Sequence, residues 1–259
     1  MKRILFYGSI DDERYDKTQA FLSVFIPKLM ERGYQIVTRE GCVPEPNTHG
    51  WLDNLVLDIA CNYRDTHALP YDRVISFRLD SATPSKHDRE LITLASSERF
   101  AGYREMLEKT DMVIAIGGRD GVYRFGLVAA ATNHFYLPLS VAGGVAGDKM
   151  TRELRDYLTN NYSKEIVNYA CKSHFEDMDM EKMINEIARC LNNPQTSSNS
   201  AITDEQFISY IENNPEKLEG MDLKRLWKLI RKLPAKVIIP LFAFALTFVV
   251  LFVMNIIMG

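Results

Sequence analysis

The run from Asp111 to Gly118, DMVIAIGG, constrains the fold of this chain more than any other stretch. Five successive apolar residues follow the aspartate and lead straight into a pair of glycines. An apolar run of this length, with no polar residue at alternate positions, is typical of a strand that is buried on both faces. Such strands occur in parallel sheets that carry helices on both sides. The run therefore predicts a parallel α/β sheet.

Residues 1–193 repeat an alternation of short apolar segments and amphipathic segments. The other expected strands are at residues 3–10, 34–41, 73–80 and 136–141, with a polar loop through Pro84 and His87 after the third. The expected helices are at residues 16–33, 50–63, 99–110, 126–134, 151–162, 164–170 and 179–193. Alternating strands and helices form a doubly wound, mainly parallel sheet of Rossmann-like type. We therefore expect one Rossmann-like α/β domain over residues 1–193.

The composition excludes several classes of protein. With 259 residues, 46% of them hydrophobic, the chain can hold one α/β core and an additional segment, and it is not a small disulfide-stapled module. The formal net charge of −3 gives no overall attraction to nucleic acid. Because the cysteines and histidines have no CxxC, HxH or HExxH spacing, we expect reduced, buried thiols and no metal site. They are Cys42, Cys61, Cys171, Cys190, His49, His67, His87, His134 and His174.

The last 23 residues, 237–259, contain no charged side chain. As a helix they would reach about 35 Å, which is enough to cross a hydrocarbon core of about 30 Å. A buried core helix is the alternative, but such helices are seldom apolar on every face over this length. We therefore expect a single membrane-spanning helix at residues 237–259.

Two segments connect this tail to the α/β domain. Residues 223–236 combine six Lys and Arg residues with apolar residues at helical spacing, which predicts a basic amphipathic helix beside the membrane. Residues 194–222 begin with a Ser- and Asn-rich stretch and predict a linker with one short helix. The basic flank, and an N-terminus that does not read as a signal peptide, predict a tail-anchored protein of the bacterial inner membrane with its N-terminal domain in the cytoplasm.

Three glycine-bearing turns follow expected strands at their carboxyl ends. Ligands of open parallel sheets bind at this edge, where glycine lets backbone N–H groups approach a phosphate and the next helix adds its positive end. One such turn is a weak signal, but three in one sheet predict a phosphate-binding site. The turns contain Gly8 and Ser9, then Gly117, Gly118, Arg119, Asp120, Gly121 and Val122, and finally Gly143 and Gly144.

Three arginines extend this prediction, because a planar guanidinium suits bidentate recognition of phosphate. Arg119 lies within the middle glycine turn, Arg78 ends the third strand, and Arg104 lies on the helix before the turn. For Arg78 and Arg104 the alternative is a surface ion pair, with Asp80 or Glu108 as the partner. Arg119 is the strongest candidate, since a cation between glycines has few structural reasons to be there.

The segment GYREMLEKTDMVIAIGGRDGV, with the upstream ILFYGS and the downstream YLPLSVAGGVAG, resembles the SLOG superfamily. This superfamily includes the cytokinin-activating LOG phosphoribohydrolases, the DprA-like proteins and bacterial nucleotide sensors. The similarity covers roughly the first three quarters of the chain. Its motifs are individually loose, but their order is informative, and the resemblance implies a nucleotide-binding Rossmann-like domain.

The sequence departs from the LOG enzymes at the residue that serves their chemistry. LOG enzymes carry a Pro-Gly-Gly-x-Gly-Thr-x-x-Glu loop, and the Glu serves N-glycosidic cleavage. Here no Pro precedes Gly117, one extra residue precedes Gly121, Val122 replaces the Thr, and Phe125 falls where the Glu would be. An aromatic ring cannot handle protons or stabilise an oxocarbenium-like centre, and Asp120 sits on the wrong side of Gly121. We therefore expect no catalytic residue and no enzyme activity.

The resemblance also implies a biological setting, because SLOG domains joined to transmembrane segments occur in Thoeris-like and cyclic-nucleotide-signalled anti-phage systems. The leading hypothesis is a membrane-anchored sensor that binds an NAD-derived or cyclic nucleotide messenger, with a cyclic ADP-ribose isomer favoured. It requires no cofactor. Binding would drive homo-oligomerisation and act on the lipid bilayer through the tail, and a TIR protein or a cyclase would make the messenger.

Two other classes of function stay open. One is a membrane-tethered nucleotide N-glycosidase or deoxyribosyltransferase-like enzyme whose tail only fixes its location. The other is a plain scaffold whose span and basic helix recruit partners to anionic lipid. Released base would favour the enzyme, a stabilising messenger would favour the sensor, and the scaffold predicts neither.

Overall fold

The computed structural model describes residues 1–39, 52–78, 88–94, 99–118, 120–132, 134–144, 146, 154–170 and 179–192. These residues all belong to the first of two compact units of the chain, Met1–Tyr210. The linker, basic helix and membrane span that we predict over residues 194–259 lie outside the described residues.

Within the described parts of the chain, no helix has the length and apolar character that a membrane crossing requires.

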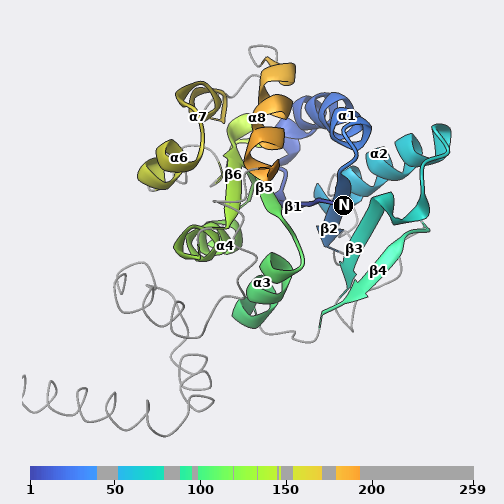
Figure 1. The fold of residues 1–259 in the computed structure, drawn as a ribbon, viewed down its shortest axis with the longest axis horizontal. Helices are drawn as coiled ribbons and strands as arrows, with labels where there is room; N and C mark the ends of the chain where they lie inside the picture. Colours follow the sequence, from blue (N-terminus) through green and yellow to red (C-terminus); the bar gives the residue numbers. More distant parts are fainter. Residues whose placement is uncertain are drawn as a thin grey trace, which may run out of the picture. The chain divides into compact units, whose positions relative to one another are not determined.

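The described residues form a six-stranded sheet in the order β4-β3-β2-β1-β5-β6 (Figure 1). Each neighbouring pair of strands is parallel. The Rossmann-like α/β fold predicted from the alternation is therefore confirmed. The strands are β1 (Arg3–Ser9), β2 (Gln35–Arg39), β3 (Val74–Arg78), β4 (Glu90–Thr93), β5 (Met112–Gly117) and β6 (Phe135–Leu139).

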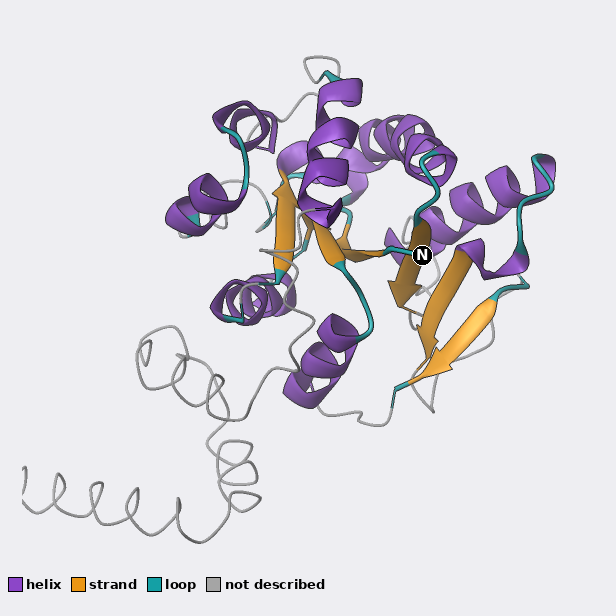
Figure 2. Ribbon diagram, viewed as in Figure 1, coloured by secondary structure: helices purple, strands orange, loops and turns teal. Residues whose placement is uncertain are grey.

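Helices cover both faces of the sheet (Figure 2). Phe6 of β1 meets Phe25 of α1, and the next strand residue, Tyr7, meets Phe125 of α4. Because successive strand residues point to opposite faces, α1 and α4 lie on opposite sides. The helices are α1 (Tyr15–Glu31), α2 (Leu52–Thr66), α3 (Arg99–Glu108), α4 (Asp120–Ala131), α6 (Arg155–Asn161), α7 (Lys164–Ala170) and α8 (Met180–Asn192), with 3-10 turns η1 (Asp12–Arg14), η2 (Tyr71–Arg73) and η3 (Ser140–Ala142).

The strand order places a topological switch point between β1 and β5. From β1 the chain adds β2, β3 and β4 on one side, then returns to place β5 and β6 on the other. In open parallel sheets, ligands bind outside the carboxyl ends of the strands at such a point. The ends of β1 and β5, Ser9 and Gly117, are register partners and mark that position.

Strand β4 is one element that the sequence did not predict. We expected a polar loop between the third strand and the next helix, but Glu90–Thr93 pairs in parallel with β3. The strand has four residues of alternating exposure, and Leu91 is 44% exposed. A half-exposed segment of this length is too short to carry a clear strand periodicity.

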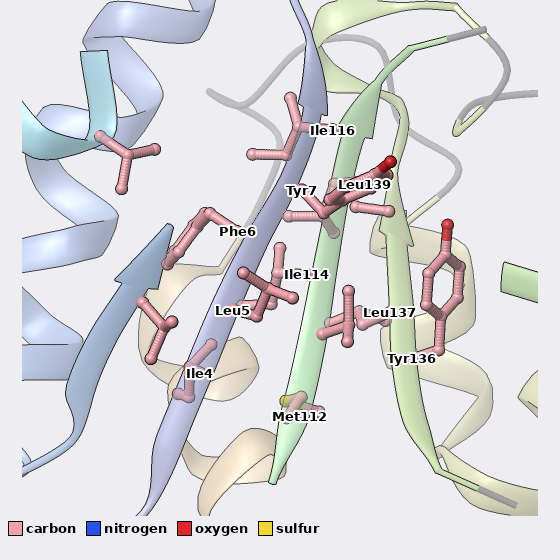
Figure 3. Close-up of a cluster of buried hydrophobic side chains, with 14 of the residues drawn as sticks. Ile4, Leu5, Phe6, Tyr7, Met112, Ile114, Ile116, Tyr136, Leu137 and Leu139 are labelled. Atoms are coloured by element: carbon pink, nitrogen blue, oxygen red, sulfur yellow. The ribbon is translucent and has the colours of Figure 1, made fainter. Parts of the chain in front are cut away.

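Figure 3 shows the part of the hydrophobic core that β1, β5 and β6 form. Every residue of β5 is buried, as its unbroken apolar run predicts, and so is every residue of β6. Figure 3 shows Leu5, Ile114 and Leu137 from the three neighbouring strands gathered in this cluster. The cluster holds the carboxyl ends of β1 and β5 in place.

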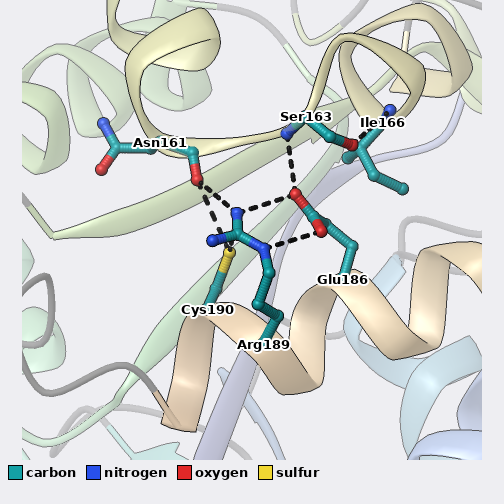
Figure 4. Close-up of polar contacts among 6 residues, drawn as sticks. All are labelled: Asn161, Ser163, Ile166, Glu186, Arg189 and Cys190. Atoms are coloured by element: carbon teal, nitrogen blue, oxygen red, sulfur yellow. Dashed lines mark hydrogen bonds and ion pairs between the residues drawn. The ribbon is translucent and has the colours of Figure 1, made fainter.

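Side chains of α8 form hydrogen bonds with the segment that joins α6 to α7 (Figure 4). The Glu186 carboxylate accepts the backbone N–H of Ser163 at 2.7 Å and two hydrogen bonds from Arg189. Arg189 in turn donates to the backbone carbonyl of Asn161. The Arg189 guanidinium and these hydrogen bonds lower the pKa of Glu186, so the carboxylate stays charged. These hydrogen bonds attach α8 to the segment between α6 and α7, which follow β6 in the chain.

Two of the four cysteines lie in described parts of the chain, and both are free and buried, as expected. Burial raises the pKa of the Cys190 thiol to about 11 and also raises that of Cys61. A thiol is reactive as the thiolate, so both are inert packing residues. Cys42 and Cys171 lie outside the described residues.

Candidate functional site

The three predicted glycine turns come together at the switch point. The Gly118 N–H donates to the Ser9 carbonyl at 3.1 Å, which joins the turn after β5 to the end of β1. The Ala146 N–H donates to the Gly117 carbonyl at 2.9 Å and brings in the chain that follows β6. Gly8 pairs with Ile116 one step further down the sheet. Turns that are far apart in the sequence are thus packed together at the ends of β1 and β5.

Glycine is required where these backbones touch. Gly117 has a φ of +61°, and a Cβ there would lie 2.1 Å from the Ser9 carbonyl oxygen. Gly144 has a φ of +64°, and its Cβ would lie 2.7 Å from the Gly117 carbonyl carbon and 2.9 Å from the Gly118 nitrogen. Contacts this short exclude any side chain. The floor of the candidate site is therefore main chain packed directly against main chain.

The first turn of α4 is fixed beside this floor by two tyrosine hydroxyls. Tyr103 donates to the Gly121 carbonyl and Tyr136 donates to the Val122 carbonyl, each at 3.1 Å. Burial raises the pKa of Tyr136 well above its ordinary value, so its hydroxyl stays protonated. Val122 itself packs against Gly118, where a Cβ would lie 2.1 Å from a Val122 methyl. The positive end of α4 is thereby held at the glycine turns.

Phe125, which the predicted resemblance to the LOG loop would place at the glutamate, lies in the core. Its side chain is fully buried and stacks on Tyr103 with ring centroids 4.8 Å apart. The Tyr7 ring meets it edge-on at 4.7 Å. Even a carboxylate at this position would need the aromatic cluster to open before it could reach a ligand.

Arg14 is a residue of the candidate site that the sequence analysis did not predict. It is the residue before α1, and a Cβ on Gly143 would lie 3.4 Å from its Nε atom. Among the residues that the structure describes, its guanidinium has no hydrogen-bond or ion-pair partner. The sequence feature that could have identified Arg14 is its position in the turn between the first strand and the first helix, where Rossmann-like folds bind phosphate.

Arg39, the last residue of β2, is a second cation that we did not predict. Its guanidinium carbon lies 5.3 Å from the centroid of the Tyr7 ring, one residue before Gly8. Below it, the Asp53 carboxylate accepts the Thr38 hydroxyl at 2.9 Å and the Arg39 backbone N–H. Burial raises the pKa of Asp53, although the nearby Arg39 charge opposes this shift. These hydrogen bonds therefore anchor the backbone at the end of β2. The Arg39 guanidinium lies over the Tyr7 ring.

The two predicted arginines with described side chains lie at the end of β3 and on α3. Arg78 ends β3, two strands away from β1, and strand alternation points it to the face opposite Arg39. Arg104 forms an ion pair with Glu108 at 2.9 Å on α3, with 38% of its side chain exposed. For Arg104 the structure thus shows the surface ion pair that was the alternative.

Other predictions for the site fall outside what is described. Arg119 is not described, and Asp120 is described only as the first residue of α4. In the described part of the chain, no group of three His, Cys, Asp or Glu residues could hold a metal ion.

Comparisons with known proteins add little to this geometry. No protein-family model matches the sequence, and no curated protein matches it. Among solved structures, the chain is similar to TM1055, an X-ray structure from the Northeast Structural Genomics Consortium, with a TM-score of 0.46 and 16% identity. The match covers 61% of this chain and 84% of TM1055. A likeness at this level does not indicate a shared function.

Proposed function

We propose that this protein binds a phosphate-containing nucleotide messenger at the ends of β1 and β5. The observation that carries the proposal is the close packing of three glycine turns against one another at the ends of β1 and β5. The N-terminus of α4 and the Arg14 guanidinium supply positive charge beside it. Bare backbone with a helix N-terminus and an arginine is the combination that recognises phosphate.

The same site is proposed to bind its ligand without cleaving it. Phe125 offers no group for proton transfer, and its burial keeps it from the ligand. A site that binds a nucleotide but has no group to cleave it suits a sensor. The messenger we favour is NAD-derived or a cyclic nucleotide, with a cyclic ADP-ribose isomer first.

The output of the sensor is proposed to be at the membrane. This step rests on the sequence, namely the uncharged residues 237–259 and the basic residues 223–236 before them. A single helix cannot form a pore, so binding would have to promote oligomers that gather the tail helices in the inner membrane. An anti-phage role, with a TIR protein or a cyclase upstream, is the setting that we propose.

The test is a binding experiment on the full chain purified in detergent. A panel of cyclic ADP-ribose isomers and cyclic nucleotides should include a compound that raises the melting temperature. We expect Arg14→Gln and Arg119→Ala to weaken that binding at least tenfold, because each removes a charge-assisted contact worth roughly 1.5–3 kcal/mol. Arg32→Gln, an exposed arginine just after α1, is the matched control and should bind normally. A panel with no stabilising compound rejects the proposal.

An enzyme is the second candidate, and one observation favours it. Asp53 is a carboxylate with a raised pKa behind Arg39, and such groups occur at catalytic sites. Its side chain is almost completely buried, however, and bonds to Thr38 and the Arg39 backbone. Incubation of the full chain with nucleoside monophosphates and NAD, with released base as the readout, distinguishes the enzyme from the sensor. Base release that is lost in Asp53→Asn would replace the sensor with an N-glycosidase.

A further inference from the structure

One buried tyrosine beside the candidate site has a hydroxyl that the described part of the chain does not satisfy. Tyr7 lies on β1, two residues before Ser9, and only 6% of it is exposed. Other rings and a guanidinium contact its ring, but among the described residues its hydroxyl has no hydrogen-bond partner. An unsatisfied buried hydroxyl costs stability, so buried hydroxyls are nearly always hydrogen-bonded. Packing alone would therefore favour Phe at this position.

The Tyr7 hydroxyl is also accessible from outside. Within the described ranges, the polar side-chain atoms that are both fully enclosed and without a partner belong to Arg73, His134 and Tyr162. The Tyr7 oxygen is not one of them, so it reaches the surface although its ring is buried. A bound molecule can therefore contact this hydroxyl.

The hydroxyl lies beside the first turn of α4. A Cβ on Gly121, the second residue of this helix, would lie 3.7 Å from the Tyr7 hydroxyl oxygen. The first N–H groups of a helix have no partner within the helix, and they carry the positive end of its dipole. Tyr7 thus adds a hydroxyl donor to the N–H donors at the N-terminus of α4.

Two neighbouring tyrosines show what a structural hydroxyl does at this place. Tyr103 donates to the Gly121 carbonyl and Tyr136 donates to the Val122 carbonyl, each at 3.1 Å. Both hydroxyls hold the first turn of α4. Tyr7 makes no such bond, so its hydroxyl is left for a partner from outside the domain.

Packing fixes the position of the Tyr7 ring. The Phe125 ring meets it edge-on at 4.7 Å between centroids, and the Tyr103 ring does so at 6.1 Å. The Arg39 guanidinium carbon lies 5.3 Å from the centroid of the Tyr7 ring. A donor on a ring that is held in this way binds a ligand with little loss of rotamer freedom.

We propose that the Tyr7 hydroxyl donates a hydrogen bond to a phosphate oxygen of the ligand at the N-terminus of α4. This inference rests on the proposed function and adds a residue that positions the phosphate. The same phosphate accepts hydrogen bonds from the first N–H groups of α4, as anions at helix N-termini do. The neutral hydroxyl orients the phosphate, whereas Arg14 supplies charge.

Tyr7→Phe tests the inference, because it removes the hydroxyl and keeps the ring. Isothermal titration calorimetry of the full chain in detergent, with AMP as the probe, should show binding weakened about tenfold, since a hydrogen bond to a charged acceptor is lost. Adenosine, which has no phosphate, should bind the variant and the unmodified chain equally. The melting temperature of Tyr7→Phe without ligand should be unchanged or higher, because the variant loses no hydrogen bond to the described part of the chain.

Tyr162→Phe is the matched control. Tyr162 is also a buried tyrosine, 4% exposed, whose hydroxyl has no hydrogen-bond partner among the described residues. Its ring packs near that of Phe135, the first residue of β6, which lies at the amino end of the sheet. The control should bind AMP as the unmodified chain does. A loss of AMP binding in both variants would show that the effect is not specific to the site, and would overturn the inference.

Other results would also overturn it. Unchanged AMP binding in Tyr7→Phe would show that the hydroxyl meets only water. An equal loss of AMP and adenosine binding would assign Tyr7 to the nucleoside. A lower melting temperature of the ligand-free variant, together with the AMP loss, would show a structural role. In these cases the proposed function stands, as it does if a compound of the messenger panel binds but AMP does not. If neither AMP nor any panel compound binds, the proposed function and this inference both fail.

Discussion

Gly117 approaches Ser9 so closely that a Cβ on the glycine would lie 2.1 Å from the serine carbonyl oxygen. The two residues are register partners at the ends of β5 and β1, and the next N–H, that of Gly118, donates to the same Ser9 carbonyl. The end of each strand therefore depends on the other. This contact is part of the fold as well as part of the site, because the turn cannot open without loss of that hydrogen bond.

Gly117→Ala is expected to destabilise the domain by roughly 2–4 kcal/mol, because it combines left-handed backbone strain with a clash against main-chain atoms. Gly33→Ala is the matched control, since Gly33 also has a positive φ, +87°, but its Cβ would meet only the Arg73 side chain at 3.7 Å. That variant should cost about 1 kcal/mol. Urea unfolding followed by circular dichroism measures both. Equal losses in the two variants would show that the Ser9 contact relaxes easily.

Restoring the missing carboxylate by Phe125→Glu should unfold the domain and give no enzyme. The substitution buries a charge among Tyr7, Tyr103 and Tyr136, and we expect a loss of at least about 4 kcal/mol. Phe125→Leu, which keeps an apolar side chain, should cost about 1–2 kcal/mol. Soluble yield and melting temperature report the difference. A folded Phe125→Glu protein that releases base from AMP would show that this position can reach the ligand after all.

His134 is expected to make the domain less stable in mild acid. Its Nε2 atom is buried with no partner among the described residues, and desolvation lowers the pKa of the ring from 6.5 to about 4. Between these values the unfolded chain binds a proton that the folded chain does not, so stability falls as pH drops from 6.5 to about 4 and levels off below. The full effect is on the order of 3 kcal/mol.

Melting curves between pH 4 and pH 8 test this dependence. His134→Leu should lose less stability than the unmodified chain as the pH falls. His67→Leu, at an exposed position just after α2, should follow the unmodified chain and serves as the control. Parallel curves for His134→Leu and the unmodified chain would mean that His134 takes up its proton in the folded state.

Glu186→Gln should loosen the joint between α8 and the segment after α6. The variant loses the charge that holds Arg189 and weakens the acceptor of the Ser163 N–H, and we expect a loss of about 1 kcal/mol, since Arg189 is half exposed. Glu165→Gln, which breaks an exposed pair with Lys182, is the control and should change little.

Hydrogen exchange at the Ser163 amide is the local measurement for this joint. Faster exchange in Glu186→Gln than in Glu165→Gln is the expected result. Because the pKa of Glu186 is lowered in the folded state, its contribution is present above the pKa of the unfolded carboxyl, 4.5, and is lost as the pH falls below it. Equal exchange rates in the two variants would show that other contacts hold the joint.

The sequence by itself determined the fold class of the domain, although it did not predict β4. The period of apolar residues is a local property, so the alternation of strands and helices could be predicted, and the unbroken run before Gly117 showed that β5 is buried on both faces. The glycines were also predictable as turns at the carboxyl ends of strands. The uncharged residues 237–259 remain the basis for the predicted membrane span.

Only the tertiary structure decided which side chains share the site. Strand order and register bring Arg14 and Arg39 to either side of the glycine turns, while Arg104 pairs with Glu108 on α3. No local pattern encodes these distances, because they depend on contacts between residues far apart in the chain. The same holds for Phe125, which was known from the sequence only as a missing carboxylate. Packing against Tyr7 and Tyr103 made it part of the core that supports the site.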